Sequence, residues 1–253
     1  MAETSTILSL GPAAAIFLVL LMAVAAFARG YTGFGMPALL VTGGSLVAAP
    51  QKLVPLILLM DVIASITQLR GVFGDIAWRR LALLLAASAI GTPLGVQALG
   101  LIEPNTARIV VALYVAAISI ALLGGWRLAR PVGDAGMLVL GFLCGFVTGV
   151  IAMGGMVIVT FLTADGTKPA ALRATLIAYF LPLDGFACLL FWREGRYDID
   201  GLSAVALAVP ILMAGLWFGG RHFLSASPEQ FRRFTLGFLI VLAAAAFVRA
   251  VAA

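Results

Sequence analysis

The amino-acid sequence predicts an all-α, polytopic integral membrane protein built from two inverted five-segment repeats with re-entrant hairpins. Three observations lead to this prediction: a very apolar composition, a second half that repeats the first, and glycine-rich breaks inside uncharged stretches. A protein of this class satisfies its backbone hydrogen bonds within helices, because lipid offers no partners for free N–H and C=O groups.

The composition excludes a soluble globular protein. Of the 253 residues, 63% are hydrophobic and only 11% are charged, whereas about a quarter are charged in ordinary soluble domains. The chain holds enough apolar sequence for ten segments of the roughly 20 residues that cross a bilayer core as helix. The net charge of +5 comes from Lys and Arg residues spread singly or in pairs, which predicts contact with anionic lipid and not with nucleic acid.

The second half repeats the first with a nearly constant shift. A shift of 123 residues places Asp61 on Asp184, and a shift of 119 places Gly30 on Gly149. Further coincidences pair Gly35 with Gly154, Arg70 with Arg193, Asp75 with Asp198, Gly91 with Gly215, Gly95 with Gly219, Pro104 with Pro228 and Arg108 with Arg232. Self-similarity of this kind is typical of duplicated transporter folds.

The repeat predicts a first transmembrane repeat at residues 1–126, a cytoplasmic linker at 127–134 and a second transmembrane repeat at 135–253. The expected apolar segments of the first repeat are 7–28, 34–51, 53–69, 81–102 and 109–126. In the second repeat, the first two segments share the uncharged run 135–164. Its 30 residues are too many for one upright span and too few for two, which favours a re-entrant hairpin broken at Gly154-Gly155.

The distribution of Lys and Arg predicts the orientation. With two passages counted for the first two segments of each repeat, alternate loops hold 11 and 5 basic residues. The richer side holds Arg29, Arg70, Arg79, Arg80, Arg127, Arg130, Lys168, Arg173, Arg221, Arg232 and Arg233. Because basic residues gather on the cytoplasmic side, both termini are expected outside, and the odd number of passages per half makes the repeats inverted.

Glycine-rich loops are the first candidate site. The segment 28–37 has three glycines in six positions followed by a proline, and the segment 148–155 repeats it. Two half-helix N-termini that meet near the membrane centre would bind an anion through backbone N–H groups. The candidate substrate-binding residues are Arg29, Gly30, Thr32, Gly33, Gly35, Thr148, Gly149, Gly154 and Gly155. Arg29 is interpreted either as an anion contact or as an orienting surface charge. Other glycines recur at spacings of four residues and are interpreted as helix-packing positions: Gly141/Gly145/Gly149, Gly91/Gly95 and Gly215/Gly219.

Two acidic residues inside apolar segments are the second candidate site. Asp61 is the ninth of the 17 residues between Lys52 and Arg70, hence near mid-depth, where an ionised side chain costs about 2.5–3.5 kcal/mol. Its copy Asp184 lies between Pro182 and Gly185. The pair is expected to couple protons, with Asp61 more buried and Asp184 more solvated at a broken helix; a packing role is the alternative.

The glycine-rich loop, its copy after the midpoint, and the Gly-Asp-Ile-Ala-Trp loop at 74–78 with its Tyr-Asp-Ile-Asp copy at 197–200 resemble the sulfite exporter (TauE/SafE-type) permease family. The resemblance implies a secondary transporter of the bacterial inner membrane for small sulfur-containing anions such as sulfite, sulfoacetate or an organosulfonate, coupled to protons. A passive anion channel and an integral-membrane enzyme are the alternatives. With one histidine, two cysteines and no hydrolase motif, neither an enzyme nor a metal or other cofactor is expected.

The orientation can be tested with single cysteines at Ser5 and Gly74 in a background lacking Cys144 and Cys188. We expect an impermeant thiol reagent added to intact cells to label position 5 and not position 74. The reverse pattern would contradict the charge-based orientation.

Overall fold

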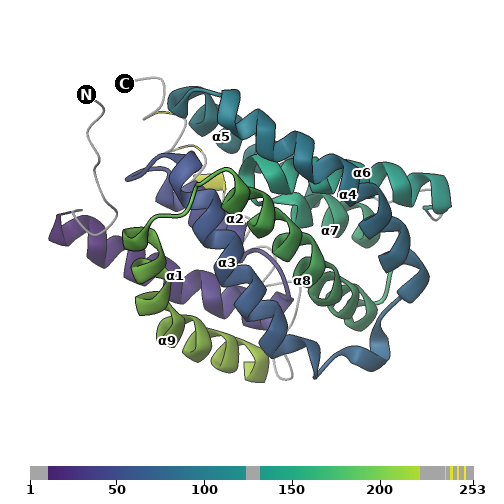
Figure 1. Cartoon of the computed structure of the whole chain (residues 1–253). Helices are drawn as coiled ribbons and strands as arrows, with labels where there is room; N and C mark the ends of the chain where they lie inside the picture. Colours follow the sequence, from purple (N-terminus) through teal and green to yellow (C-terminus); the bar gives the residue numbers. More distant parts are fainter. Residues whose placement is uncertain are drawn as a thin grey trace.

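The computed structural model describes residues 11–123 and 132–222, with the single positions Gly237, Ile240, Val241, Ala244 and Val248. These residues form helices and loops, with no strand among them, as the sequence predicts. The helices are α1 (Pro12–Thr32), α2 (Met36–Gly44), α3 (Pro50–Leu69), α4 (Trp78–Leu101), α5 (Pro104–Leu123), α6 (Asp134–Ile151), α7 (Gly154–Ala164), α8 (Pro169–Arg193) and α9 (Ile199–His222), and a short 3₁₀ turn, η2 (Phe73–Asp75), precedes α4 (Figure 1).

Seven of these helices are long and apolar enough to span a membrane. The exceptions are α2, with 9 residues, and α7, with 11 residues, which at about 1.5 Å per residue are roughly half the thickness of a bilayer core. A proline lies in the first turn of α1, α2, α3 and α8, where its missing N–H costs nothing. The short helices are therefore the second elements of the two predicted repeats.

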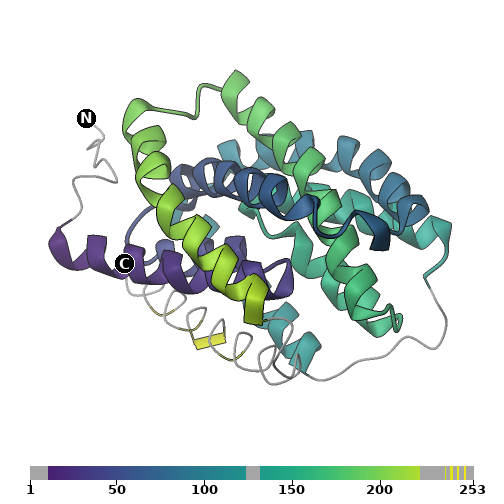
Figure 2. The same ribbon diagram turned by 90° about the horizontal axis from the view of Figure 1, so that it is seen from below.

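The helices pack in pairs that match the two repeats. The main contacts join α4 to α6 and α1 to α9, with α3 and α8 packed against each other between these pairs (Figures 1 and 2). The α4–α6 pair and the α1–α9 pair each join the first helix of one predicted repeat to the fourth helix of the other. The α3–α8 pair joins the two third helices. This exchange of equivalent helices supports the internal duplication, while the inversion of the repeats relative to a membrane stays a prediction.

The glycine ladders allow the closest of these contacts. Gly145 and Gly149 on α6 face backbone atoms of Ser88 and Thr92 on α4, and Gly219 on α9 faces the backbone of α1. Gly91 and Gly95 face α6, Gly141 faces Leu84, and Gly215 faces Ala26 and Phe27. The interpretation of all three ladders as packing positions is therefore confirmed.

Polar contacts bring the ends of α6 and α7 to one end of α4. At the start of α4, Arg79 pairs with Asp134 of α6 at 2.5 Å, and Arg80 pairs with Asp165, just after α7, at 2.9 Å. The backbone N–H of Val132 also donates to Asp165 Oδ1 at 2.8 Å. The helices α6 and α7 therefore form a hairpin that returns to the end of the molecule where it starts.

The short helix α2 ends near the opposite end of α4. Arg108 Nε, in α5, donates to the carbonyl oxygen of Ser45 at 3.0 Å, and Gln51 Nε2 donates to the carbonyl oxygen of Ile102 at 2.9 Å. Since Ile102 follows the last residue of α4, α2 and α7 end at opposite ends of this helix. This arrangement supports two oppositely directed hairpins; their re-entrant placement in a membrane stays a prediction.

Several sequence-based boundaries are wrong. The hairpin of the second repeat turns at Ala152 and Met153, because Gly154 is already the first residue of α7. The expected segment 34–51 is helical only in α2, followed by the start of α3. The helix α8 runs unbroken through Pro182, so the expected break beside Asp184 is also wrong. Most of the predicted linker and the last segment of the second repeat lie outside the described residues.

The packing role of Gly149 can be tested by stability. A Cβ at this position would lie 2.6 Å from Thr92 O and Val96 N, whereas one at Gly185, inside α8, would meet nothing within 4 Å. We expect Gly149→Ala to lower the free energy of unfolding of the detergent-solubilised protein by about 1–3 kcal/mol. The control Gly185→Ala should leave it unchanged or raise it by up to about 1 kcal/mol, because alanine favours helix. Equal effects of the two substitutions would contradict the close α4–α6 contact.

Candidate functional site

The guanidinium group of Arg29 lies in the last turn of α1, completely buried at 0% exposure. Its Nε is 2.9 Å from Oδ1 of Asp61 on α3, and its Nη2 donates to Ser65 Oγ at 2.7 Å. Its Nη1 donates to the carbonyl oxygen of Gly33, just after α1. Arg29 is therefore not a surface charge, and the interpretation of this residue as an orienting cation is wrong.

The carboxyl groups of Asp61 and Asp184 meet where α3 packs against α8. The two groups are close enough to interact electrostatically, and the residues are 1% and 2% exposed. The expectation that Asp184 is the more solvated residue is wrong, because the helix around it is continuous and shields it from water. Two buried carboxylates beside one cation would leave a negative charge without compensation, so one of the two acids carries a proton. The ion pair with Arg29 favours the ionised form of Asp61. The proton is therefore assigned to Asp184.

These three residues form what we call the charge cluster: Arg29, Asp61 and Asp184. With the proton on Asp184, the cluster holds one positive and one negative charge and is neutral overall. Neutrality matters here because an unpaired buried charge is strongly destabilising. The cluster can thus hold a proton and pair a cation with an anion at the same place, deep among apolar helices.

The first glycine turn, at residues 33–35, is held by hydrogen bonds in the last turn of α1. Gly33 has φ = 79° and caps α1 by donating its N–H to the carbonyl oxygen of Arg29, a left-handed conformation that suits glycine. Gly35 follows with φ = 92°. Thr32 Oγ1 donates to the carbonyl oxygen of Ala28 at 2.8 Å. The expected turn is real but short, spanning the residues between α1 and α2.

The second glycine turn, at Ala152 and Met153 between α6 and α7, has the same left-handed cap as the first. Ala152 has φ = 57° and donates its N–H to the carbonyl oxygen of Thr148, as Gly33 does to Arg29. The shift of 119 residues that pairs Gly30 with Gly149 also pairs Gly33 with Ala152 and Arg29 with Thr148. Matching left-handed caps at matching positions are a structural trace of the duplication that the sequence indicates.

The glycines of the candidate site have different roles. Gly30 lies inside α1 against the backbone of Leu216 in α9, and Gly149 lies inside α6 against α4. These two glycines therefore lie in helices and not in the loops where the sequence placed them, and anion binding by either stays a prediction. Gly154 packs on the backbone of Cys144, whose thiol contacts its carbonyl oxygen at 3.1 Å. Anion binding by the remaining loop positions stays a prediction.

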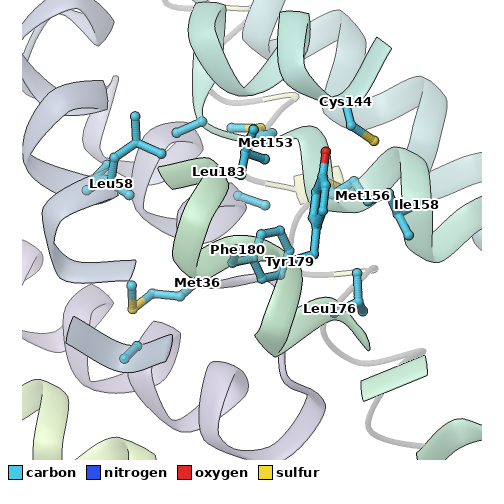
Figure 3. Packing of buried hydrophobic residues seen from close by; sticks show 14 of the residues in the cluster. Met36, Leu58, Cys144, Met153, Met156, Ile158, Leu176, Tyr179, Phe180 and Leu183 are labelled. Carbon is cyan, nitrogen blue, oxygen red and sulfur yellow. The ribbon is translucent and has the colours of Figure 1, made fainter. Parts of the chain in front are cut away.

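Phe180 of α8 connects the two glycine turns. The Arg29 guanidinium carbon lies 4.7 Å from the centre of the Phe180 ring, a cation–π contact, and the same ring faces Gly155 at the start of α7. Figure 3 shows Phe180 in one buried cluster with Met36, beside the first turn, and Met153, in the second. The two turns and the charge cluster thus share one region of the interior.

Comparison with known protein families identifies the chain. The family model described as sulfite exporter TauE/SafE matches residues 18–246, nearly the whole chain. The chain belongs to the sulfite exporter TauE/SafE family. Comparisons with curated proteins and with solved structures gave no match. Membership of this family makes the chain a multi-pass membrane transporter of the sulfite-exporter type.

In this TauE/SafE protein, sequence reasoning missed four residues that surround the cluster. Ser65 and Gln68 follow Asp61 by four and seven positions on α3, a helical spacing that could have identified them. Arg173 Nη2 donates to the carbonyl oxygen of Gly30 at 3.0 Å, although its charge alone suggested an orienting residue. Phe180 carried no sequence signal beyond its position four residues before Asp184. Among the described residues, no group of three His, Cys, Asp or Glu side chains could hold a metal.

The dependence of the fold on the Arg29–Asp61 pair can be tested by substitution. We expect Arg29→Met to lower the free energy of unfolding by about 3–5 kcal/mol, because Asp61 is then a buried charge without its partner. The double variant Arg29→Met/Asp61→Asn should regain a large part of this loss, since no charge remains unpaired. Chemical denaturation of the purified protein measures both. Additive effects of the two substitutions would show that the pair makes no such contribution.

Proposed function

We propose that the protein transports a small sulfur-containing anion, such as sulfite, sulfoacetate or an organosulfonate, across the inner membrane together with protons. The observation that carries this proposal is the charge cluster of Arg29, Asp61 and Asp184, buried where α1, α3 and α8 meet. Membership of the sulfite exporter family supports the class of substrate.

Arg29 supports the choice of an oxyanion. A guanidinium group presents several N–H donors in one plane, which match the oxygens of a carboxylate or sulfonate. In the structure, these donors contact Asp61, Ser65 and the carbonyl oxygen of Gly33, so the surroundings are already arranged for oxygen acceptors. The glycine turn beside Arg29 would bring further backbone N–H groups to the same anion.

The two carboxyl groups support coupling to protons. Acidic residues within membrane-spanning helices typically mark ion or proton pathways. Here two of them are buried beside a single cation, so one of them would carry a proton. A passive anion channel would need the same cation but no carboxyl group that exchanges protons. With both termini outside and two oppositely directed hairpins, the transporter would alternate access by moving one repeat against the other.

Flux into proteoliposomes tests this proposal. We expect labelled sulfite and sulfoacetate to be taken up, with faster initial rates when the medium is more acidic than the lumen, and labelled taurine, which has no net charge, to be taken up more slowly. Asp61→Asn should abolish the acceleration by the pH gradient while leaving anion exchange measurable. Asp134→Asn, which removes a surface ion pair more than half exposed, serves as the matched control and should keep the acceleration.

Voltage-driven sulfite flux in the parent protein with no effect of the pH gradient would favour the passive channel. No flux of any of these anions, with protein shown to be folded and inserted, would overturn the proposal.

A further inference from the structure

We infer that the transported anion and the Asp61 carboxylate compete for the same guanidinium group, so that one proton is taken up with each monoanion bound. This inference rests on the proposed function and specifies its substrate as singly charged. It follows from the contacts of Arg29 and from the charge that the cluster can hold.

The first step is chemical equivalence. The Asp61 carboxylate forms an ion pair with Arg29 through one oxygen, Oδ1, which lies 2.9 Å from Nε. A sulfonate oxygen is an acceptor of the same charge type and can occupy the same position. The remaining contacts of Arg29, with Ser65 Oγ and the carbonyl oxygen of Gly33, hold the guanidinium in place while its acidic partner is exchanged.

The second step is the balance of charge. The cluster is neutral with Arg29 protonated, Asp61 ionised and Asp184 carrying a proton. An anion that entered without a proton would leave a net negative charge buried among apolar helices, which is strongly unfavourable. If a proton from water binds Asp61 as the anion binds Arg29, the cluster is neutral again.

The proton transfer needs no other reactant. An O–H bond forms between the incoming proton and the Asp61 carboxylate, the Arg29–Asp61 ion pair separates, and the Arg29–anion pair forms. Release on the other side reverses these changes: the anion leaves, Asp61 loses its proton to water and pairs with Arg29 again. No bond within the substrate is made or broken.

The surroundings of Asp61 show which groups control this exchange. Among the described residues, those that act on the carboxyl pair are Arg29 from α1 and, from α8, Asp184, Tyr179 and Cys188. Arg173, also on α8, is close enough to Arg29 to act on it electrostatically. Only Asp61 among these groups both pairs with Arg29 and carries a negative charge that a proton can neutralise.

The consequence for specificity is a preference for monoanions. Asp184 already holds a proton, so the cluster can accept one more proton, on Asp61. A dianion bound at Arg29 would leave one negative charge without compensation. Methanesulfonate and sulfate test this directly, because both present tetrahedral sulfur oxyanions, while methanesulfonate carries one charge and sulfate two across the whole working pH range.

The experiment is calorimetric titration of the purified full-length protein in detergent with methanesulfonate. Titration in two buffers of different ionisation enthalpy gives the number of protons taken up. We expect uptake of about one proton per anion above the pH at which Asp61 ionises, with the affinity falling about tenfold for each pH unit there. Sulfate should bind at least tenfold more weakly than methanesulfonate.

Variants separate the possible outcomes. Asp61→Asn should bind methanesulfonate with no proton uptake and no pH dependence, whereas Asp134→Asn should behave as the parent protein. If Asp61→Asn does not fold, the proton uptake of the parent protein still decides the question. Binding of methanesulfonate without proton uptake, or equal affinity for sulfate, would overturn the inference while leaving sulfur-anion transport standing. Absence of both binding and flux for every anion would overturn the proposed function as well.

Discussion

The ion pair between Arg29 and Asp61 is the constraint on which the interior depends. A guanidinium at 0% exposure is stable among apolar helices only if an acid neutralises it and its N–H groups find acceptors. The acid comes from α3, one acceptor from Ser65 on the same helix, and another from the carbonyl of Gly33 after α1. The pair therefore fixes the end of α1 against α3 and determines where the first glycine turn lies.

Close helix packing brings these polar groups together in the buried interior. The glycines of α6 and α9 let backbone approach backbone on α4 and α1, so the α4–α6 and α1–α9 pairs form two compact units on either side of α3 and α8 (Figure 2). The short helices α2 and α7 begin directly after the two turns. The turns lie inside the protein, where irregular backbone is tolerated because protein surrounds it. Packing and electrostatics thus converge on the same central region.

Much of the fold could be predicted from the sequence, because apolar length and glycine position are local signals. The segments around Asp61 and Asp184, the glycine turns and the packing ladders follow from these signals. The contact between Arg29 and Asp61 could not be predicted, since it joins residues 32 positions apart whose approach depends on how α1 crosses α3. The solvation of Asp184 was misjudged because Pro182 does not break α8: a buried helix can lose one hydrogen bond and continue when its neighbours hold it in place. Gly30 and Gly149 were assigned to loops because a glycine looks the same in a turn and in a tight helix contact until the partner helix is known.

The two carboxyl groups, which the sequence predicts to be copies of each other, have different partners. The predicted repeat supplies an acid in each half, Asp61 and Asp184. Among the described residues, a fully buried arginine occurs in only one half, because Thr148 occupies the position equivalent to Arg29. One cation cannot balance two buried carboxylates, so one of the acids has to keep a proton. The difference between the copies therefore comes from the charge of the partner that each half provides and not from their exposure, which is nearly equal. A difference at a single position of the predicted repeat, Arg29 against Thr148, is therefore sufficient to give the two acids different partners.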